Sequence, residues 1–196
     1  MIKRLFDIAA SGLGILVLSP LLAIIAIVVK SDGGPALYRG RRVGRGGGVF
    51  DMLKFRTMVM NADKMGPSST ADDDPRITRV GKFLRRYKLD ELPQLFNVFK
   101  GDMSVVGPRP QVEWAVVRYN DVEREVLRVR PGITDPASLQ FPNEGEILRG
   151  SSDPDEDYWR LIHPEKMRLS VDYVRHATFA DDMRIILQTL RTIVRK

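Results

Sequence analysis

The sequence predicts an α/β fold in which a small, mostly helical core with short strands follows a long apolar segment at the N-terminus. Three observations predict it. Residues 9–29 carry no charge, residues 35–60 read as two short strands around a Gly/Arg-rich turn, and several later stretches have helical periodicity. At 196 residues, 43% of them hydrophobic, the chain is long enough for one folded domain plus an appendage.

Composition excludes several kinds of site. The chain has no cysteine, which rules out disulfides, a thiol nucleophile and a cysteine zinc site, and its two histidines argue against a His-rich metal site. The net charge of +6 is uneven, because residues 1–100 carry 17 Lys/Arg against 9 Asp/Glu while residues 101–196 carry 14 against 16. A basic first half suits a phosphate-bearing partner, namely nucleic acid, anionic lipid or a nucleotide, although it also serves solubility alone.

The uncharged stretch from Ala9 to Val29 is long enough to enter a bilayer as a helix, for which about 20 apolar residues suffice. It is too long for the core of a signal peptide, and no small-residue cleavage site follows it. Pro20, after Ser19, should kink the helix because it removes a backbone hydrogen bond. Basic residues flank both ends, so the positive-inside rule orients no spanning helix. The residues alone leave open a spanning helix and a helix–break–helix hairpin in which Ser19 bonds a freed carbonyl.

The remaining elements follow from local patterns. Residues 35–60 predict a hairpin whose turn, 39–48, holds four arginines and five glycines, either as a solvated tip or as a basic loop near headgroups or a phosphate. Residues 130–146 predict a loop. Helices are expected at residues 76–87, 91–100, 111–130, 163–177 and 180–196. Pro93 suits the first turn of the second of these helices and Gly101 its C-terminal cap. The last helix is basic and amphipathic, which suits the core or a membrane surface.

Two adjacent acids, Asp90 and Glu91, stand in a basic neighbourhood. The basic residues around them are Arg79, Lys82, Arg85, Arg86, Lys88 and Arg109. An acid at a helix start most often caps the helix. In a cationic pocket, however, it stays ionised at pH 7 and can attack a phosphate that the pocket holds. A divalent cation would relieve the repulsion between the two anions, and Mg²⁺ suits one or two carboxylates plus substrate phosphates.

Three motifs carry a family resemblance. KFRTM (54–58), LDELPQLFNVFKGDMSVVGPRP (89–110) and RPGIT (130–134), behind an apolar segment with Ser-Pro at its middle, closely resemble the small monotopic phosphoglycosyl transferases of bacteria. The resemblance covers nearly the whole chain. It implies an α/β-type catalytic domain, residues 33–196, with amphipathic helices on the membrane surface. It also implies a re-entrant membrane hairpin, residues 1–32, that breaks at Ser19 and Pro20. Both ends of the hairpin and the active site would then lie on the cytoplasmic face of the bacterial inner membrane.

The resemblance also implies a reaction. Asp90 matches the family's nucleophile, which attacks the β-phosphate of a UDP-sugar, releases UMP and carries the phosphosugar as an aspartyl phosphate. Polyprenyl phosphate then takes the phosphosugar, which is the first membrane step of a bacterial glycoconjugate pathway such as exopolysaccharide synthesis. Glu91 matches the second member of the catalytic pair and is expected to assist the lipid phosphate step or to position the metal. Asp90 is also expected to contact Mg²⁺.

The same matches assign binding roles. Phosphate or nucleotide binding is expected of Arg85, Pro108, Arg109, Pro110, Lys54 and Arg56. For Lys54 and Arg56, which belong to KFRTM, structural salt bridges are the alternative. The expected partners are a UDP-sugar, polyprenyl phosphate and the lipid bilayer, without nucleic acid, and a homodimer is one option for the assembly.

One departure from the family pattern stands out. Many family members read RPGITG, whereas this chain continues with Asp135 and Pro136, which removes a flexible glycine and puts in doubt any transfer of sugar contacts from this loop. Rival interpretations explain less of the sequence. A nucleic-acid module lacks aromatic residues among its basic ones, an inactive membrane-anchored scaffold leaves Asp90 and Glu91 unexplained, and an aspartate-dependent phosphatase needs no membrane. Direct transfer, with Asp90 only holding the metal, is the nearest mechanistic alternative.

Overall fold

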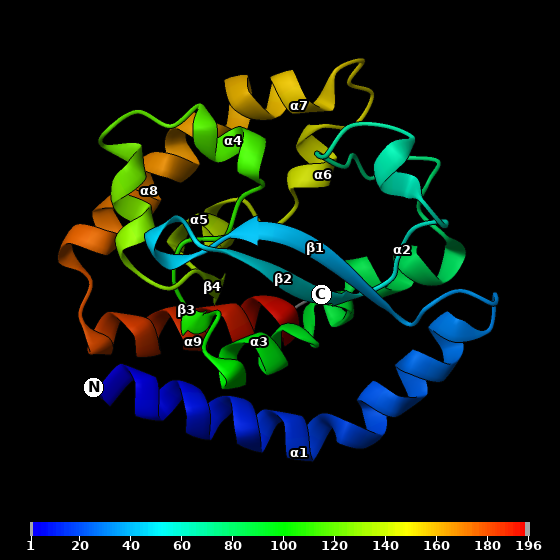
Figure 1. Ribbon diagram of the computed structural model, residues 1–196, viewed down its shortest axis with the longest axis horizontal. Helices are drawn as coiled ribbons and strands as arrows, with labels where there is room; N and C mark the ends of the chain where they lie inside the picture. The colour runs from blue at the N-terminus through cyan, green and yellow to red at the C-terminus, as the bar shows by residue number, and fades with distance from the viewer. Residues whose placement is uncertain (1, 195–196) are drawn as a thin grey trace.

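The computed structural model describes residues 2–194, with side chains as far as Thr192. Met1 and residues 195–196, the outer ends of the predicted 1–32 and 33–196 units, lie outside the described residues. The α-helices are α1 Ile2–Lys30, α2 Arg79–Arg86, α3 Gln94–Lys100, α4 Glu113–Val117, α5 Pro136–Gln140, α6 Glu144–Ile147, α7 Pro154–Asp157, α8 His163–His176 and α9 Phe179–Val194. Helix α1 runs along one side of the molecule beneath α3 and α9, and a two-stranded ribbon separates these helices from α4, α6, α7 and α8 (Figure 1).

Helix α1 is bent but continuous. Pro20 lies inside it, and the ribbon changes direction partway along (Figure 1). The Ser19 hydroxyl donates to the Leu16 carbonyl across 2.8 Å. This carbonyl lies four residues before Pro20, which has no N–H to offer it. The hydrogen bond predicted for Ser19 is therefore present, and Pro20 lies within one continuous, bent helix rather than at a non-helical break.

The first half of α1 is bonded to the core. Lys3 Nζ donates to Asp182 Oδ2 on α9 at 2.5 Å. Asp7 is buried, and its Oδ1 accepts hydrogen bonds of 3.0 Å from the Ser104 hydroxyl and from the Val105 backbone N–H. These contacts fix strand β3, which leads directly into the Gly-Pro-Arg-Pro segment.

Two small sheets frame the site. Strands β1 Leu37–Val43 and β2 Val49–Phe55 form the predicted hairpin, joined through the 3₁₀ turn η1 Arg45–Gly47. Strands β3 Ser104–Val106 and β4 Gly132–Thr134 pair in parallel. Beneath them Met52, Val98 and Met103 are almost completely buried and form a common core.

The structure corrects two predictions. Residues 130–146 are not a loop, because they contain β4, α5 and α6. Residues 111–130 are not one helix, because α4 and the 3₁₀ segment η4 Glu123–Arg128 are separate. Two reciprocal hydrogen bonds mark the start of η4. Asn120 Oδ1 accepts from the Glu123 N–H at 3.0 Å, and Glu123 Oε2 accepts from the Asn120 N–H at 2.8 Å. The other predicted helices are present as α2, α3, α8 and α9.

Candidate active site

Asp90 and Glu91 lie in a short 3₁₀ turn, η3 Leu89–Glu91, just before α3. Lys88, which precedes the turn, has a left-handed backbone with φ of 57°. Helix α3 starts after Pro93, and no side chain accepts a hydrogen bond from its first turn. Neither acid therefore caps α3, and the capping alternative is wrong.

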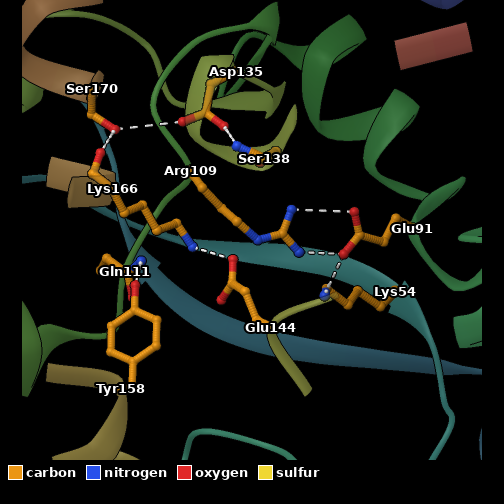
Figure 2. A network of polar contacts seen from close by, with 10 residues as sticks. All are labelled: Lys54, Glu91, Arg109, Gln111, Asp135, Ser138, Glu144, Tyr158, Lys166 and Ser170. Carbon is orange, nitrogen blue, oxygen red and sulfur yellow. Dashed lines mark hydrogen bonds and ion pairs between the residues drawn. The ribbon is translucent and has the colours of Figure 1, made fainter. Parts of the chain in front are cut away.

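Glu91 is held on both carboxylate oxygens. Lys54 Nζ, from β2, donates to Oε1 at 2.9 Å. Arg109 donates through Nη1 to Oε2 at 3.2 Å and through Nη2 to Oε1 (Figure 2). Burial works against ionisation of Glu91, but the positive charges of Arg109 and Lys54 outweigh it and hold the pKa of Glu91 well below its ordinary value. Glu91 is therefore a fixed anion between two cations.

Asp90 has the opposite environment. Its residue is only 6% exposed, and no described residue donates a hydrogen bond to its carboxylate. Burial raises the pKa of Asp90, and the negative charge of Glu91 adds to the shift. The positive charges of Lys54, Arg85 and Lys88 oppose it. The sequence argument gave the cations the leading effect on Asp90, whereas in the structure burial is the larger one.

The Gly-Pro-Arg-Pro segment is placed by β4. The Gly107 N–H donates to the Thr134 carbonyl and the Gly132 N–H to the Pro108 carbonyl, both at 3.0 Å. The two chains approach so closely that a Cβ on Gly132 would lie 2.1 Å from the Gly107 nitrogen. The RPGIT motif thus sets the position of Arg109, and Pro108 and Pro110 are buried on either side of it.

Arg85 and Arg56 have different positions. Arg85 is close enough for its charge to lower the pKa of Asp90, and its guanidinium makes no hydrogen bond or ion pair with another residue that the structure describes. Arg56 is buried away from the acids: its guanidinium donates to the Val29 carbonyl at 3.0 Å, to the Pro35 carbonyl at 2.8 Å and to Asp32. The phosphate role predicted for Arg56 is therefore replaced by its structural alternative, because Arg56 ties the end of α1 to the hairpin.

Sequence reasoning missed the acidic and basic groups on the far side of Arg109. Lys166 of α8 is buried and donates to Glu144 of α6 at 2.5 Å (Figure 2). Burial opposes ionisation of Glu144, but Lys166 and Arg109 together lower its pKa. Beside them, Gln111 Nε2 donates to the Tyr158 hydroxyl at 3.0 Å. The prediction of a loop over 130–146 hid Glu144, since nothing local connects it with Arg109.

Comparisons with known proteins show the family to which the chain belongs. The family described as "Bacterial sugar transferase" matches residues 1–196. The undecaprenyl-phosphate galactose phosphotransferase of Salmonella typhimurium is 38% identical over 100% of this chain and 41% of its own length. The exopolysaccharide production protein ExoY of Rhizobium meliloti is 43% identical over 98% of this chain and 85% of its own.

The name of a third relative includes both a sugar nucleotide and a lipid phosphate. The UDP-N-acetylgalactosamine-undecaprenyl-phosphate N-acetylgalactosaminephosphotransferase of Aeromonas hydrophila is 35% identical over 98% of this chain and 44% of its own length. The chain therefore spans less than half the length of the Salmonella and Aeromonas relatives. Given the family match from residue 1 to residue 196, the chain belongs to the bacterial sugar transferase family.

Proposed function

We propose that this chain transfers a phosphosugar from a UDP-sugar to polyprenyl phosphate, with Asp90 as the covalent carrier and UMP as the first product. One observation carries the proposal: the Asp90 carboxylate is nearly buried beside Lys54 and Arg85 yet accepts no hydrogen bond from a described residue. The names of the relatives support a lipid phosphate acceptor and, for the Aeromonas protein, a UDP-sugar donor. The name of the ExoY relative supports a role in exopolysaccharide production.

In the first step, an Asp90 carboxylate oxygen attacks the β-phosphorus of the UDP-sugar. The bond from that phosphorus to the oxygen bridging the two phosphates breaks, and the bridging oxygen leaves with the bonding electrons as part of UMP. Asp90 then carries the phosphosugar. Lys54 and Arg85, whose charges both act on Asp90, stabilise the negative charge on the phosphoryl oxygens.

In the second step, a phosphate oxygen of polyprenyl phosphate attacks the same phosphorus, and Asp90 leaves as a carboxylate. The product is a polyprenyl-diphospho-sugar. Both oxygens of Glu91 are bonded to Lys54 and Arg109, so Glu91 holds these cations toward the phosphates rather than exchanging protons with them. Glu91 is in this respect a positioning residue.

The site residues fit Mg²⁺. This ion commonly takes one or two carboxylates and completes its shell with substrate phosphates and water. Asp90 offers a carboxylate that accepts no hydrogen bond from a described residue, whereas Glu91 is bonded to Lys54 and Arg109. Because no group of three or more His, Asp or Glu side chains gathers at this site or anywhere else among the described residues, substrate phosphates and water would have to supply the other ligands. When bound, the ion neutralises charge between carboxylate and phosphates. Asp90 would hold it together with phosphate oxygens of the substrate.

Helix α1 is the proposed membrane segment. It contains an 18-residue window of mean hydropathy 2.8, and only 17% of that window is buried within the fold. The bend around Pro20 and the bonds from Lys3 and Asp7 to the core support a re-entrant path that enters and leaves the same leaflet. Both ends of α1 and the active site would then lie at the cytoplasmic face of the bacterial inner membrane.

Intact mass measurement tests the reaction. The purified protein is incubated in detergent with a panel of UDP-sugars and Mg²⁺, without polyprenyl phosphate. We expect a mass gain equal to one phosphosugar with the correct donor, and no gain for Asp90→Asn, which keeps the shape of the side chain. An unmodified protein that still releases UMP once lipid phosphate is added would establish direct transfer. An absence of both signals with every common UDP-sugar would contradict the proposed activity.

A further inference from the structure

The four arginines of the hairpin turn have different surroundings. Arg41 pairs with Glu113 at 3.2 Å, and Arg45 donates to the Arg128 carbonyl at 3.1 Å, both at the surface. Arg39 is exposed to solvent. Arg42 is partly buried, and its guanidinium donates one hydrogen bond among the described residues, from Nη1 to the Arg41 carbonyl at 2.8 Å. Among the described residues, no carboxylate pairs with Arg42.

Arg42 lies on the face of the hairpin that carries Lys54. Side chains alternate along a strand, so Tyr38, Gly40 and Arg42 share one face of β1. Tyr38 is directly opposite Lys54 in the register of the sheet, so this is the face that reaches Glu91. A Cβ on Gly40 would lie 3.0 Å from the Tyr38 ring and 3.2 Å from Arg42 Nη1. The Arg42 guanidinium therefore extends back over Gly40, in the direction of Tyr38 and Lys54.

The same strand end contacts the segment that holds Arg109. The Val43 N–H donates to the Gln111 carbonyl at 2.9 Å, which brings residue 42 beside residues 109–111. Burial lowers the pKa of Arg42, and the positive charge of Arg109 adds to this, although Tyr38 opposes it. Arg42 nevertheless stays protonated, as guanidinium groups in proteins do.

The two guanidinium groups differ in one respect. Arg109 is neutralised by Glu91, whereas Arg42 is partly withdrawn from water and pairs with no carboxylate among the described residues. Removing part of the water from a cation that has no anionic partner costs free energy, and an anion bound beside it would reduce that cost. A planar guanidinium matches phosphate oxygens in two-point contact.

We propose that Arg42 is a further anion-binding residue of the site and that it binds the phosphoryl oxygens of a reactant. This inference rests on the proposed function for the identity of that reactant, which is either the diphosphate of the donor sugar nucleotide or the terminal phosphate of the lipid acceptor. Arg42 and Lys54 then approach the phosphates from the hairpin, while Arg109 and Arg85 approach them from other segments of the chain.

Binding of inorganic diphosphate tests the anion site without any assumption about the reaction. Calorimetry on the detergent-solubilised chain compares the wild type with Arg42→Met and with the control Arg39→Met, which removes the same charge from the exposed face of the same strand. Loss of a charge-assisted hydrogen bond predicts about 10- to 100-fold weaker binding for Arg42→Met. The control should bind like the wild type. Equal binding by Arg42→Met and Arg39→Met, or no binding by the wild type, would overturn the inference.

The two half-reactions identify the source of the phosphate. Slower loading of Asp90 by the UDP-sugar in Arg42→Met assigns the residue to the donor, and slower discharge to polyprenyl phosphate assigns it to the acceptor. Unchanged rates in both half-reactions would also overturn the inference. Should no UDP-sugar load the wild type, the proposed function fails, while the diphosphate measurement still decides whether Arg42 binds anions. Arg42→Lys, which keeps the charge, should recover part of the binding, and equal melting temperatures exclude misfolding.

Discussion

Lys54 Nζ and Glu91 Oε1 lie 2.9 Å apart, and this contact joins the hairpin to the turn that carries Asp90. Arg109 completes the arrangement by donating to both carboxylate oxygens of Glu91. The neighbouring acids consequently differ in chemistry despite being adjacent in sequence. Glu91 is an ionised, fixed group, whereas the Asp90 carboxylate accepts no hydrogen bond from a described residue and has a raised pKa. This difference suits Asp90 as a nucleophile and Glu91 as a positioning residue.

Replacing Lys54 by methionine should change the pH dependence of Asp90 loading. The loading step needs ionised Asp90, so its rate rises with pH through the pKa of that carboxyl, which lies above the ordinary 3.8. Lys54 lowers this pKa, so its removal raises it and moves the inflection to higher pH. The measurement is the rate of mass gain with the donor from pH 4 to 8.

Lys100→Met is the matched control for charge removal. Lys100 is largely exposed and pairs with Asp102 rather than with either acid of the site. Its removal should leave the inflection where it is in the wild type. An inflection that stays in place in Lys54→Met as well would show that Lys54 does not act on Asp90.

Glu91→Ala should destabilise the fold. It leaves the mostly buried cations Lys54 and Arg109 without their anion, and loss of one partner from such an arrangement costs about 3 to 5 kcal/mol. The measurement is chemical unfolding in detergent. Glu165→Ala, which breaks a solvent-exposed pair with Arg168, should have little effect and serves as the control.

The same variant has a pH signature. The folded-state pKa of Glu91 is depressed, so the stabilisation that it gives is present above its ordinary value of 4.5 and is lost as pH falls through the folded pKa. The difference in unfolding free energy between wild type and Glu91→Ala should therefore shrink in acid. A difference that is constant from pH 7 to pH 3 would contradict the ionic origin of the effect.

Local sequence signals predicted much of this arrangement. Alternation around a glycine-rich turn predicted the β1–β2 hairpin, and Pro93 and Gly101 predicted the limits of α3. Gly101 has a left-handed backbone, with φ of 106°, as a helix C-cap requires. The candidate site was predicted because Asp90 and Glu91 lie close in sequence to several of the cations that surround them.

The elements and contacts that the sequence did not predict depend on interactions between segments that are distant in sequence. Strand β4 has three residues and pairs only with β3, so its sequence has no period to detect. Glu144 of α6 and Lys166 of α8 lie 22 residues apart in sequence and meet only in the folded chain, which no spacing predicts. One signal was available for α5: Asp135 precedes Pro136, and its side chain accepts from the Ser138 N–H at 2.7 Å as an N-cap.

Gly132→Ala should impair catalysis without removing any functional group. The added Cβ would meet the backbone of Gly107, so β3 and β4 must separate and the Arg109 segment must move with them. A displacement near 1 Å in an active site can lower the rate by about 100-fold. We therefore expect the rate of Asp90 loading to fall by about tenfold or more. Gly48→Ala is the control, because its Cβ would be in ordinary contact with the Arg45 carbonyl at 3.8 Å. Equal loading rates in Gly132→Ala and Gly48→Ala would contradict the claim that the RPGIT motif positions Arg109 for the reaction.

The absence of cysteine makes the path of α1 directly measurable. Single cysteines at Ile2 and Ser31, both exposed near the ends of the helix, can be labelled with a membrane-impermeant maleimide in right-side-out and inverted vesicles. If α1 is re-entrant, Ile2→Cys and Ser31→Cys should react only in inverted vesicles. Ser152→Cys, in the core domain, should behave in the same way. Leu16→Cys, 72% exposed in the protein but expected in lipid, should react in neither. Labelling of Ile2→Cys and Ser31→Cys from opposite sides would establish a spanning helix, and the bend at Pro20 would then be a kink within a transmembrane segment.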